Sequence, residues 1–337
     1  MARRAQAEQV VVTPRRPELW RRTLAARELG VLIALVVVLS TFSVLNRNFL
    51  TVDTFGDILT QAAELGIAAV GVTFLMIAGE FDLSVGSNFA VAGILLALLT
   101  TNLGWSPFLA IPLVLGVATA IGVLNGVITL GTRIPSFITT LGTMMFWRGI
   151  ALAVTGGWPI HVLGSSRMLD LLGGMAVYQT VRISALWWLL VTVLFWFLLV
   201  KTPYGNWTFA TGGKPEAARA LGVPVGRVKL TNFALAGLLA GFAGFTQFGR
   251  MGSMSPVWGD GLPMETIAAA VIGGTSLMGG AGTILGTVLG AITMASIRVG
   301  LIMVGAPSYW YTAFLGAVIV VAVILNVRLG EMMAWRR

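Results

Sequence analysis

Long apolar runs, separated by short polar connections, occupy most of the chain between residues 29 and 326. A helix needs about 17–25 apolar residues to cross a bilayer, and two of the ten runs, the third and the eighth, fall short of this length. We expect re-entrant or broken helices at these two. The pattern predicts an all-α, polytopic membrane protein of about ten transmembrane or partly re-entrant helices, at 29–46, 58–79, 87–101, 107–130, 136–155, 185–201, 231–250, 264–278, 282–304 and 308–326.

Lysine and arginine residues are divided unevenly between the two sides of this arrangement. An even number of crossings places both termini on one side, and that side carries sixteen basic residues against four on the other. Cytoplasmic loops carry the excess of Lys and Arg in membrane proteins. We therefore expect both termini in the cytoplasm, and four basic residues on the outer side: Arg47, Arg167, Arg182 and Arg250.

The charge distribution also divides the chain into parts. We expect a basic cytoplasmic tail without regular structure at 1–28, a transmembrane domain at 29–326, and a second cytoplasmic tail at 327–337. A polar cytoplasmic loop at 202–230 interrupts the transmembrane domain.

Composition narrows the possible functions. The chain is 57% hydrophobic and 10% charged, whereas soluble proteins carry about 25% charged residues. The net charge is +9, and most of the basic residues lie beside membrane segments, where they set the orientation of the chain. We therefore expect membrane lipid as a partner and no nucleic acid. With no cysteine and a single histidine, His161, we expect neither a metal site nor catalytic residues.

Several polar residues fall within or beside the apolar runs. Gly79-Glu-Phe-Asp-Leu-Ser-Val-Gly-Ser87 joins the second and third runs, and it has two interpretations. It is a capped helix junction with glycines at the turn, or a gate or hinge beside a translocation path. A membrane path needs polar groups that face its interior, and the candidates are Asp82, Ser84, Ser87, Asn88 and Asn125.

Two further polar residues within the apolar runs each have two interpretations. Asn125 either bonds a neighbouring helix or contacts a substrate, and Arg148 either snorkels outward or pairs locally. The glycine-rich turn at 273–283 lacks the lysine of a phosphate-binding loop, so we expect a tight turn there. It shares a faint pattern with residues 79–87, and internal duplication is typical of transporters.

The loop at 202–230 contains signals for one short helix. Pro203 ends the preceding helix, and Gly205, Gly212 and Gly213 predict a loose backbone after it. Pro215 and Glu216 suit a first helical turn, and Gly222 followed by Pro224 ends the helix. This helix is either a cytoplasmic docking element or part of an ordinary connecting loop.

Three motifs resemble one family. Glu216-Ala-Ala-x-x-x-Gly222 resembles the EAA coupling loop of permease subunits in bacterial ATP-binding-cassette importers. Its surroundings, the segment at 79–87 and Ala269-Ala-Val-Ile-Gly-Gly-Thr-Ser-Leu-Met-Gly-Gly280 are similar to the ribose/xylose-type monosaccharide branch. Glu80 and Phe81 depart from that branch, which has Gly and Ile there.

The resemblance implies a role and a set of partners. It implies a sugar permease in the bacterial inner membrane, paired with a second permease copy as a homodimer. Two cytoplasmic ATP-binding subunits and a periplasmic sugar-binding protein complete such an importer. ATP and Mg would bind in the partner ATPase, and this chain would carry no cofactor. The ATPase-coupling residues implied are Glu216, Ala217, Ala218 and Gly222.

Three other functions are alternatives to this one. A branched-chain amino-acid permease of the same class needs groups for both charges of a zwitterion, and charges within the apolar runs are sparse. A membrane-embedded enzyme has little support, because the chain lacks cysteine and has one histidine. The third is a stand-alone, proton-coupled secondary transporter, whose candidate relays are Glu64, Glu80, Asp82 and Glu265.

Overall fold

The computed structural model describes residues 18–162, 167–178 and 180–334, and helices occupy all ten predicted segments. The first half contains α1 (Glu18–Leu45), α2 (Val52–Ile77), α3 (Val85–Ala97) with a π-helical turn η1 (Leu98–Asn102), α4 (Pro107–Thr132) and α5 (Ser136–Thr155). The second half contains α7 (Ile183–Lys201), α8 (Pro203–Gly213), α9 (Pro215–Ala220), α10 (Val225–Met251), α11 (Leu262–Ile272), α12 (Ile284–Met303) and α13 (Ser308–Ala334). The predicted all-α class is confirmed.

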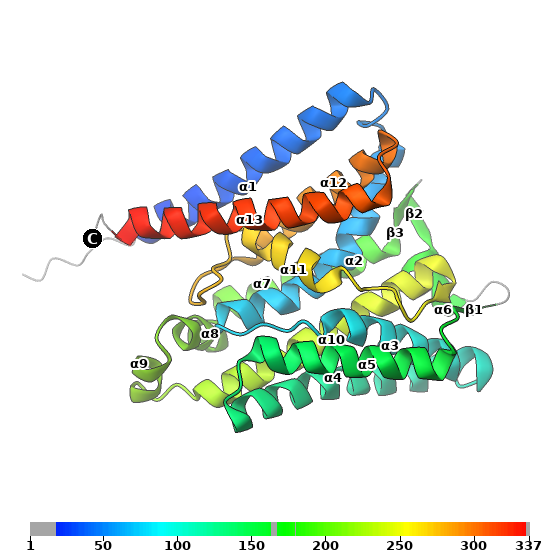
Figure 1. Ribbon diagram of the computed structural model, residues 1–337, viewed down its shortest axis with the longest axis horizontal. Helices are drawn as coiled ribbons and strands as arrows, with labels where there is room; N and C mark the ends of the chain where they lie inside the picture. Colours follow the sequence, from blue (N-terminus) through cyan, green and yellow to red (C-terminus); the bar gives the residue numbers. More distant parts are fainter. Residues whose placement is uncertain (1–17, 163–166, 179, 335–337) are drawn as a thin grey trace, which may run out of the picture.

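Short elements between α5 and α7 close one end of the molecule. They are β1 (Ile160–His161), α6 (Arg167–Leu169), a π-helical turn η2 (Asp170–Gly174), β2 (Ala176–Tyr178) and β3 (Val181–Arg182). β4 (Ser253–Met254) follows α10 and pairs antiparallel with β1, and β2 pairs antiparallel with β3. We call this end, opposite α8 and α9, the outer end (Figure 1).

The helices lie side by side between the outer end and an inner end formed by α8 and α9 (Figure 1). The start of α1 and the end of α13 both lie at the inner end, so the first and last helices enter and leave the bundle on one side, as the sequence predicts. α1 begins at Glu18 and α13 continues to Ala334, so both extend beyond the predicted boundaries. Within the predicted tails, residues 1–17 and 335–337 lie outside the described residues.

Within the described residues, seven helices are long and apolar enough to cross a membrane. α2 lies at the centre and packs against α10, α12, α7 and α11. Small residues let the helices approach closely, as in other membrane bundles. A Cβ atom at Gly237 of α10, for example, would lie 2.5 Å from the carbonyl oxygen of Ala118 in α4.

Two non-helical segments interrupt the bundle. Residues 78–84 run between α2 and α3, and residues 252–261 precede α11. α11 has 11 residues, which span about 16 Å, half of the hydrocarbon thickness of about 30 Å. The eighth segment is therefore a half-helix, as its shortness predicted, whereas α3 and η1 together form an 18-residue span.

The beginnings of α3 and α11 meet. Gly86, in the first turn of α3, packs against Gly259 so closely that a Cβ atom would lie 2.1 Å from the Gly259 carbonyl oxygen. Discontinuous helices whose N-terminal ends converge within the membrane are the architecture from which many transporters build their binding sites. We call residues 78–84 the inner segment and residues 252–261 the outer segment.

Candidate functional site

The predicted short helix at the inner end is present as α9. Pro215 occupies its first turn with Glu216, and it ends before Gly222, which has the left-handed φ of 84°. The amide of Val223 donates to the carbonyl of Ala218 at 3.0 Å, which closes this end. Ala218 is buried, whereas the Leu221 side chain just after α9 is 85% exposed.

The predicted loose backbone at 203–213 is wrong, because these residues form α8. Pro203 starts a new helix at its first turn, where a missing N–H costs nothing. The glycines serve close packing instead of flexibility. A Cβ atom added at Gly205 would lie 1.8 Å from the carbonyl oxygen of Leu199. One added at Gly212 would lie 1.8 Å from the carbonyl oxygen of Ile77.

Gly212 brings α8 against both glycine-rich turns. The amide of Gly280 donates to the Ile77 carbonyl at 2.8 Å. A Cβ atom at Gly279 would lie 2.8 Å from the Gly212 oxygen and 3.0 Å from the Gly79 Cα. The two turns that share a faint sequence pattern therefore meet around Gly212, and we call this contact the glycine hub.

A tyrosine fixes α8 to the bundle. Tyr204 stacks on Phe74 of α2 with ring centroids 6.4 Å apart, and its hydroxyl donates to the side-chain oxygen of Asn232 in α10. Asn232 in turn donates to the Phe74 carbonyl at 3.2 Å. Burial raises the pKa of the Tyr204 phenol above its ordinary range, so the hydroxyl stays protonated and remains a donor. α8 is thus a rigid link between α9 and the membrane helices.

The polar candidates of the inner segment and its neighbours lie together. Asp82 accepts a hydrogen bond from the Ser84 amide at 2.7 Å, and the Asn125 amide donates to Ser84 Oγ at 2.7 Å and to Asp82 at 3.3 Å. Ser87 donates to the Ser84 carbonyl at 2.9 Å. Asn88 bonds the carbonyls of Ala118 and Gly237 in α4 and α10. All five candidates are at most 1% exposed.

α5 holds the inner segment through two hydroxyls. Ser136 Oγ accepts from the amide of Phe81 at 3.1 Å, and Thr140 Oγ1 accepts from the amide of Leu83 at 3.0 Å. These contacts satisfy backbone donors that a non-helical segment within a membrane protein exposes. The position of α5 and that of the inner segment are therefore linked.

Three further ion pairs hold parts of the bundle together. Arg250 of α10 pairs with Glu64 of α2 through Nε–Oε1 at 2.5 Å and Nη2–Oε2 at 3.0 Å. Lys229 of α10 pairs with Glu80 of the inner segment. Arg298 of α12 pairs with Glu265 of α11, and its guanidinium lies 4.5 Å from the ring centroid of Tyr311. Three of the four candidate proton relays therefore have cationic partners.

The sequence interpretation missed a contact of the outer segment. Arg148 of α5 bonds the carbonyls of Pro256 and Trp258 and pairs with Asp260. The signal was present, because an arginine within an apolar span needs a partner. The partner could not be chosen, since it lies on a segment from the other half of the chain.

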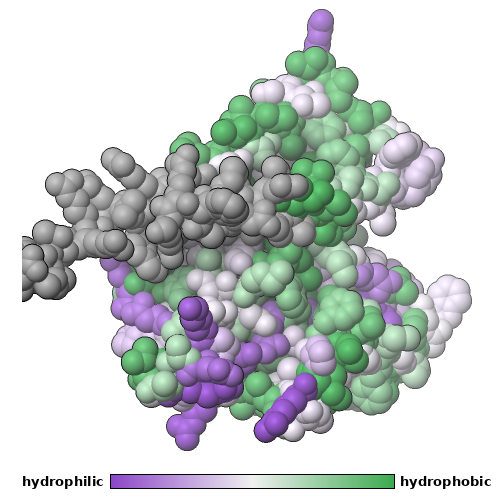
Figure 2. Space-filling view, turned by 60° about the vertical axis from the view of Figure 1, so that its left-hand side comes forward, coloured by the Kyte–Doolittle hydropathy of each residue, from purple (hydrophilic) through white to green (hydrophobic). Residues whose placement is uncertain are grey.

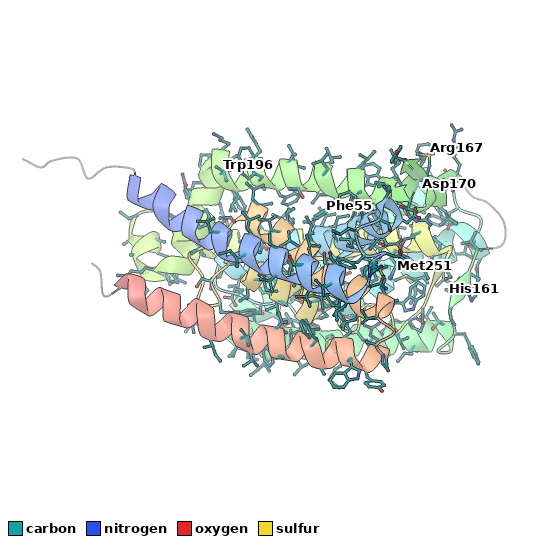
Figure 3. The ribbon with its side chains drawn as sticks, turned by 90° about the horizontal axis from the view of Figure 1, so that it is seen from above. Phe55, His161, Arg167, Asp170, Trp196 and Met251 are labelled. Carbon is teal, nitrogen blue, oxygen red and sulfur yellow. The ribbon has the colours of Figure 1, made fainter. Side chains whose placement is uncertain are left out.

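The inner end is polar and hollowed. Hydrophilic side chains gather over the α8–α9 end, while the flanks are mostly hydrophobic (Figure 2). A cavity of about 500 Å³ opens there between α9, the α4–α5 turn and the inner segment, and its lining includes Glu80, Arg133, Ser136 and Arg219. At the opposite end lie His161, Arg167 and Asp170 (Figure 3).

Comparisons with known proteins agree on one kind of protein. Residues 54–323 match the family described as "Branched-chain amino acid transport system / permease component". The ribose import permease protein RbsC of Escherichia coli (strain K12) is 34% identical over 88% of this chain and 92% of its own length. RbsC of Bacillus subtilis (strain 168) is 36% identical over 89% of this chain and 92% of its own length.

A relative with another substrate is also similar. The autoinducer 2 import system permease protein LsrC of Photorhabdus laumondii is 32% identical over 90% of both chains. No solved structure matches the chain.

Proposed function

The chain belongs to the family of branched-chain amino acid transport system permease components, and we propose that it is the permease of an ATP-driven monosaccharide importer. It is a polytopic protein of the bacterial inner membrane and a transport subunit, not an enzyme. The similar ribose import permeases match 88% and 89% of the chain and support a sugar as its substrate.

The observation that carries the proposal is the position of α9. This helix lies at the polar inner end, is followed directly by the exposed Leu221, and is tied through α8 to the glycine hub. A short exposed helix that is fixed to the membrane helices in this way can pass the movement of a docked ATPase to the bundle. In the proposed complex, α9 docks on the ATPase through Glu216, Ala217, Ala218 and Gly222.

The full importer contains several chains. We assign it two copies of this permease, two cytoplasmic ATP-binding subunits, which bind ATP and Mg, and a periplasmic sugar-binding protein. The outer end, with His161, Arg167 and Asp170 (Figure 3), is the face available to the binding protein. The homodimer is consistent with the large apolar faces that α4 and α5 leave exposed.

The enclosed polar cluster around Asp82 acts, in this proposal, as a gate or hinge of the translocation path. The beginning of α3, where the inner segment ends, is fixed by hydrogen bonds of Asp82, Ser84, Ser87, Asn88 and Asn125. The inner segment starts at the glycine hub, so a movement of α9 reaches this gate through α8 and Gly212.

The proposal is tested with the permease, its ATPase and its binding protein in proteoliposomes. We expect ATP-dependent ribose uptake that Gly222→Ala reduces, because alanine in a left-handed conformation costs about 1–2 kcal/mol. Gly226→Ala is the matched control, since a Cβ atom has open space at both positions but Gly226 lies in α10 without a left-handed φ. Uptake that follows a proton gradient without ATP would contradict the proposal. Uptake of leucine and not of sugars would show that the substrate is an amino acid.

A further inference from the structure

Arg148 is the contact by which α5 holds the outer segment. Its Nη1 atom donates to the carbonyl oxygen of Trp258 at 2.9 Å and also to that of Pro256. Its Nη2 atom pairs with Oδ1 of Asp260 at 2.7 Å. One guanidinium therefore binds three acceptors on five consecutive residues, and the start of α11 follows directly after them.

The two charged side chains differ in exposure. The Arg148 side chain is 14% exposed, whereas the Asp260 side chain is 67% exposed. Arg148 lies seven residues before the end of α5 at Thr155, about 11 Å along the helix axis. The pair is thus within the membrane span and not at its surface.

A carboxylate cannot face hydrocarbon at this depth. Charged residues within membrane segments face the bundle interior or a water-filled space, because exposure to lipid is costly. The Asp260 carboxylate is 67% exposed, so it borders an aqueous space and not lipid.

The inner end of the same helix borders a second polar space. Ser136, in the first turn of α5, lines the cavity of about 500 Å³ together with Glu80. A polar opening at the inner end and an exposed carboxylate toward the outer end thus lie along a single helix. Two parts of α5 therefore have polar surroundings.

We propose that Asp260, held by Arg148, is a sugar-binding station on the outer half of the translocation path. This inference rests on the proposed function and assigns residues to it. The exposed Asp260 oxygens accept hydrogen bonds from sugar hydroxyls, which are both donors and acceptors. Arg148 acts as a positioning residue, because its guanidinium already binds three acceptors.

The geometry favours a hydroxyl-rich neutral ligand over an amino acid. A zwitterion needs a free cation for its carboxylate, and Arg148 is enclosed and engaged with Pro256, Trp258 and Asp260. An anion would meet the exposed carboxylate of Asp260 and be repelled. Hydroxyl donors find a free acceptor there without breaking the ion pair.

The first test uses the absence of cysteine from the chain. In the reconstituted complex, we expect Asp260→Cys to react with a charged, membrane-impermeant thiol reagent, and a transported sugar delivered by the binding protein to slow the reaction. Leu194→Cys on α7 is the control, since Leu194 is 58% exposed on an apolar helix face. Equal, slow labelling at both positions overturns the aqueous path, and labelling unchanged by the sugar overturns the binding station.

The second test keeps the shape of the side chain. Asp260→Asn should raise the KM for uptake about tenfold or more, because hydrogen bonds to a charged acceptor are lost. Asp53→Asn, at an exposed position in the first turn of α2, should leave KM unchanged. A wild-type KM in Asp260→Asn overturns the inference alone, whereas a wild-type complex that imports none of a panel of pentoses and hexoses contradicts the proposed function itself.

Discussion

Gly212 of α8 lies so close to Ile77 of α2 that a Cβ atom would come within 1.8 Å of the Ile77 carbonyl oxygen. The next residue, Gly213, has room, because its nearest neighbour would lie 3.8 Å from a Cβ atom. This contact connects the cytoplasmic helices to the end of the central membrane helix. It joins α9, through α8, to the inner segment.

The Gly212 contact predicts a pair of outcomes. We expect Gly212→Ala to separate α8 from the glycine hub, to cost about 1–3 kcal/mol of stability, and to reduce ATP-dependent uptake. Gly213→Ala should behave as the wild-type protein. The melting temperature of the purified permease and uptake in proteoliposomes measure the two effects. Equal uptake in the two variants would show that the hub does not transmit motion.

Leu221 predicts a loss of coupling without a loss of stability. Its side chain is 85% exposed, and substitutions at such positions usually change stability by less than about 0.5 kcal/mol. Leu221→Ala should therefore melt as the wild type does, yet fail to stimulate the partner ATPase when sugar is supplied. Leu103→Ala is the matched control, because Leu103 is 65% exposed at the outer end. Normal stimulation in Leu221→Ala would remove this residue from the docking surface.

A substitution at Asn125 tests whether this residue holds the gate in place or contacts the substrate. Asn125→Ala removes the amide that bonds Ser84 and Asp82, which should destabilise the protein by about 1–3 kcal/mol. Since Asn125 is fully buried, we expect the maximal uptake rate to fall while the KM for sugar stays constant. Asn102→Ala, at an exposed position, serves as the control. A raised KM would instead make Asn125 a substrate contact.

The sequence predicted the membrane segments and α9 well, for physical reasons. Apolar runs of sufficient length must be helical in a bilayer, and Pro215 and Gly222 mark the two ends of a short helix. α8 was missed because Pro203, Gly205 and Gly212 are loop signals in isolation. Their role in close packing depends on Leu199 and Ile77, and for Gly212 that contact comes from a distant part of the chain.

The candidate site was predicted less completely. The cluster of Asp82, Ser84 and Asn125 was recognised as polar groups in an apolar setting, and the structure brings these three into contact. The pair of Arg148 and Asp260 was not predicted, because pairing across a chain depends on tertiary structure. Burial of a charge indicates that a partner exists, but it does not indicate which carboxylate supplies it.

The pair of Glu64 and Arg250 predicts the behaviour of a structural ion pair, not that of a proton relay. The Glu64 side chain is 10% exposed, and both of its oxygens bind Arg250. Removal of one partner from a buried pair typically costs about 3–5 kcal/mol. The Arg250→Ala variant should therefore unfold at much lower temperature, and the double variant with Glu64→Gln should regain part of the lost stability.

A proton relay at Glu64 would have another signature. Uptake by the Glu64→Gln variant would then be independent of the pH gradient, while its stability stayed at the wild-type value. Melting curves of the two single variants and the double variant, with uptake at two external pH values, separate these outcomes.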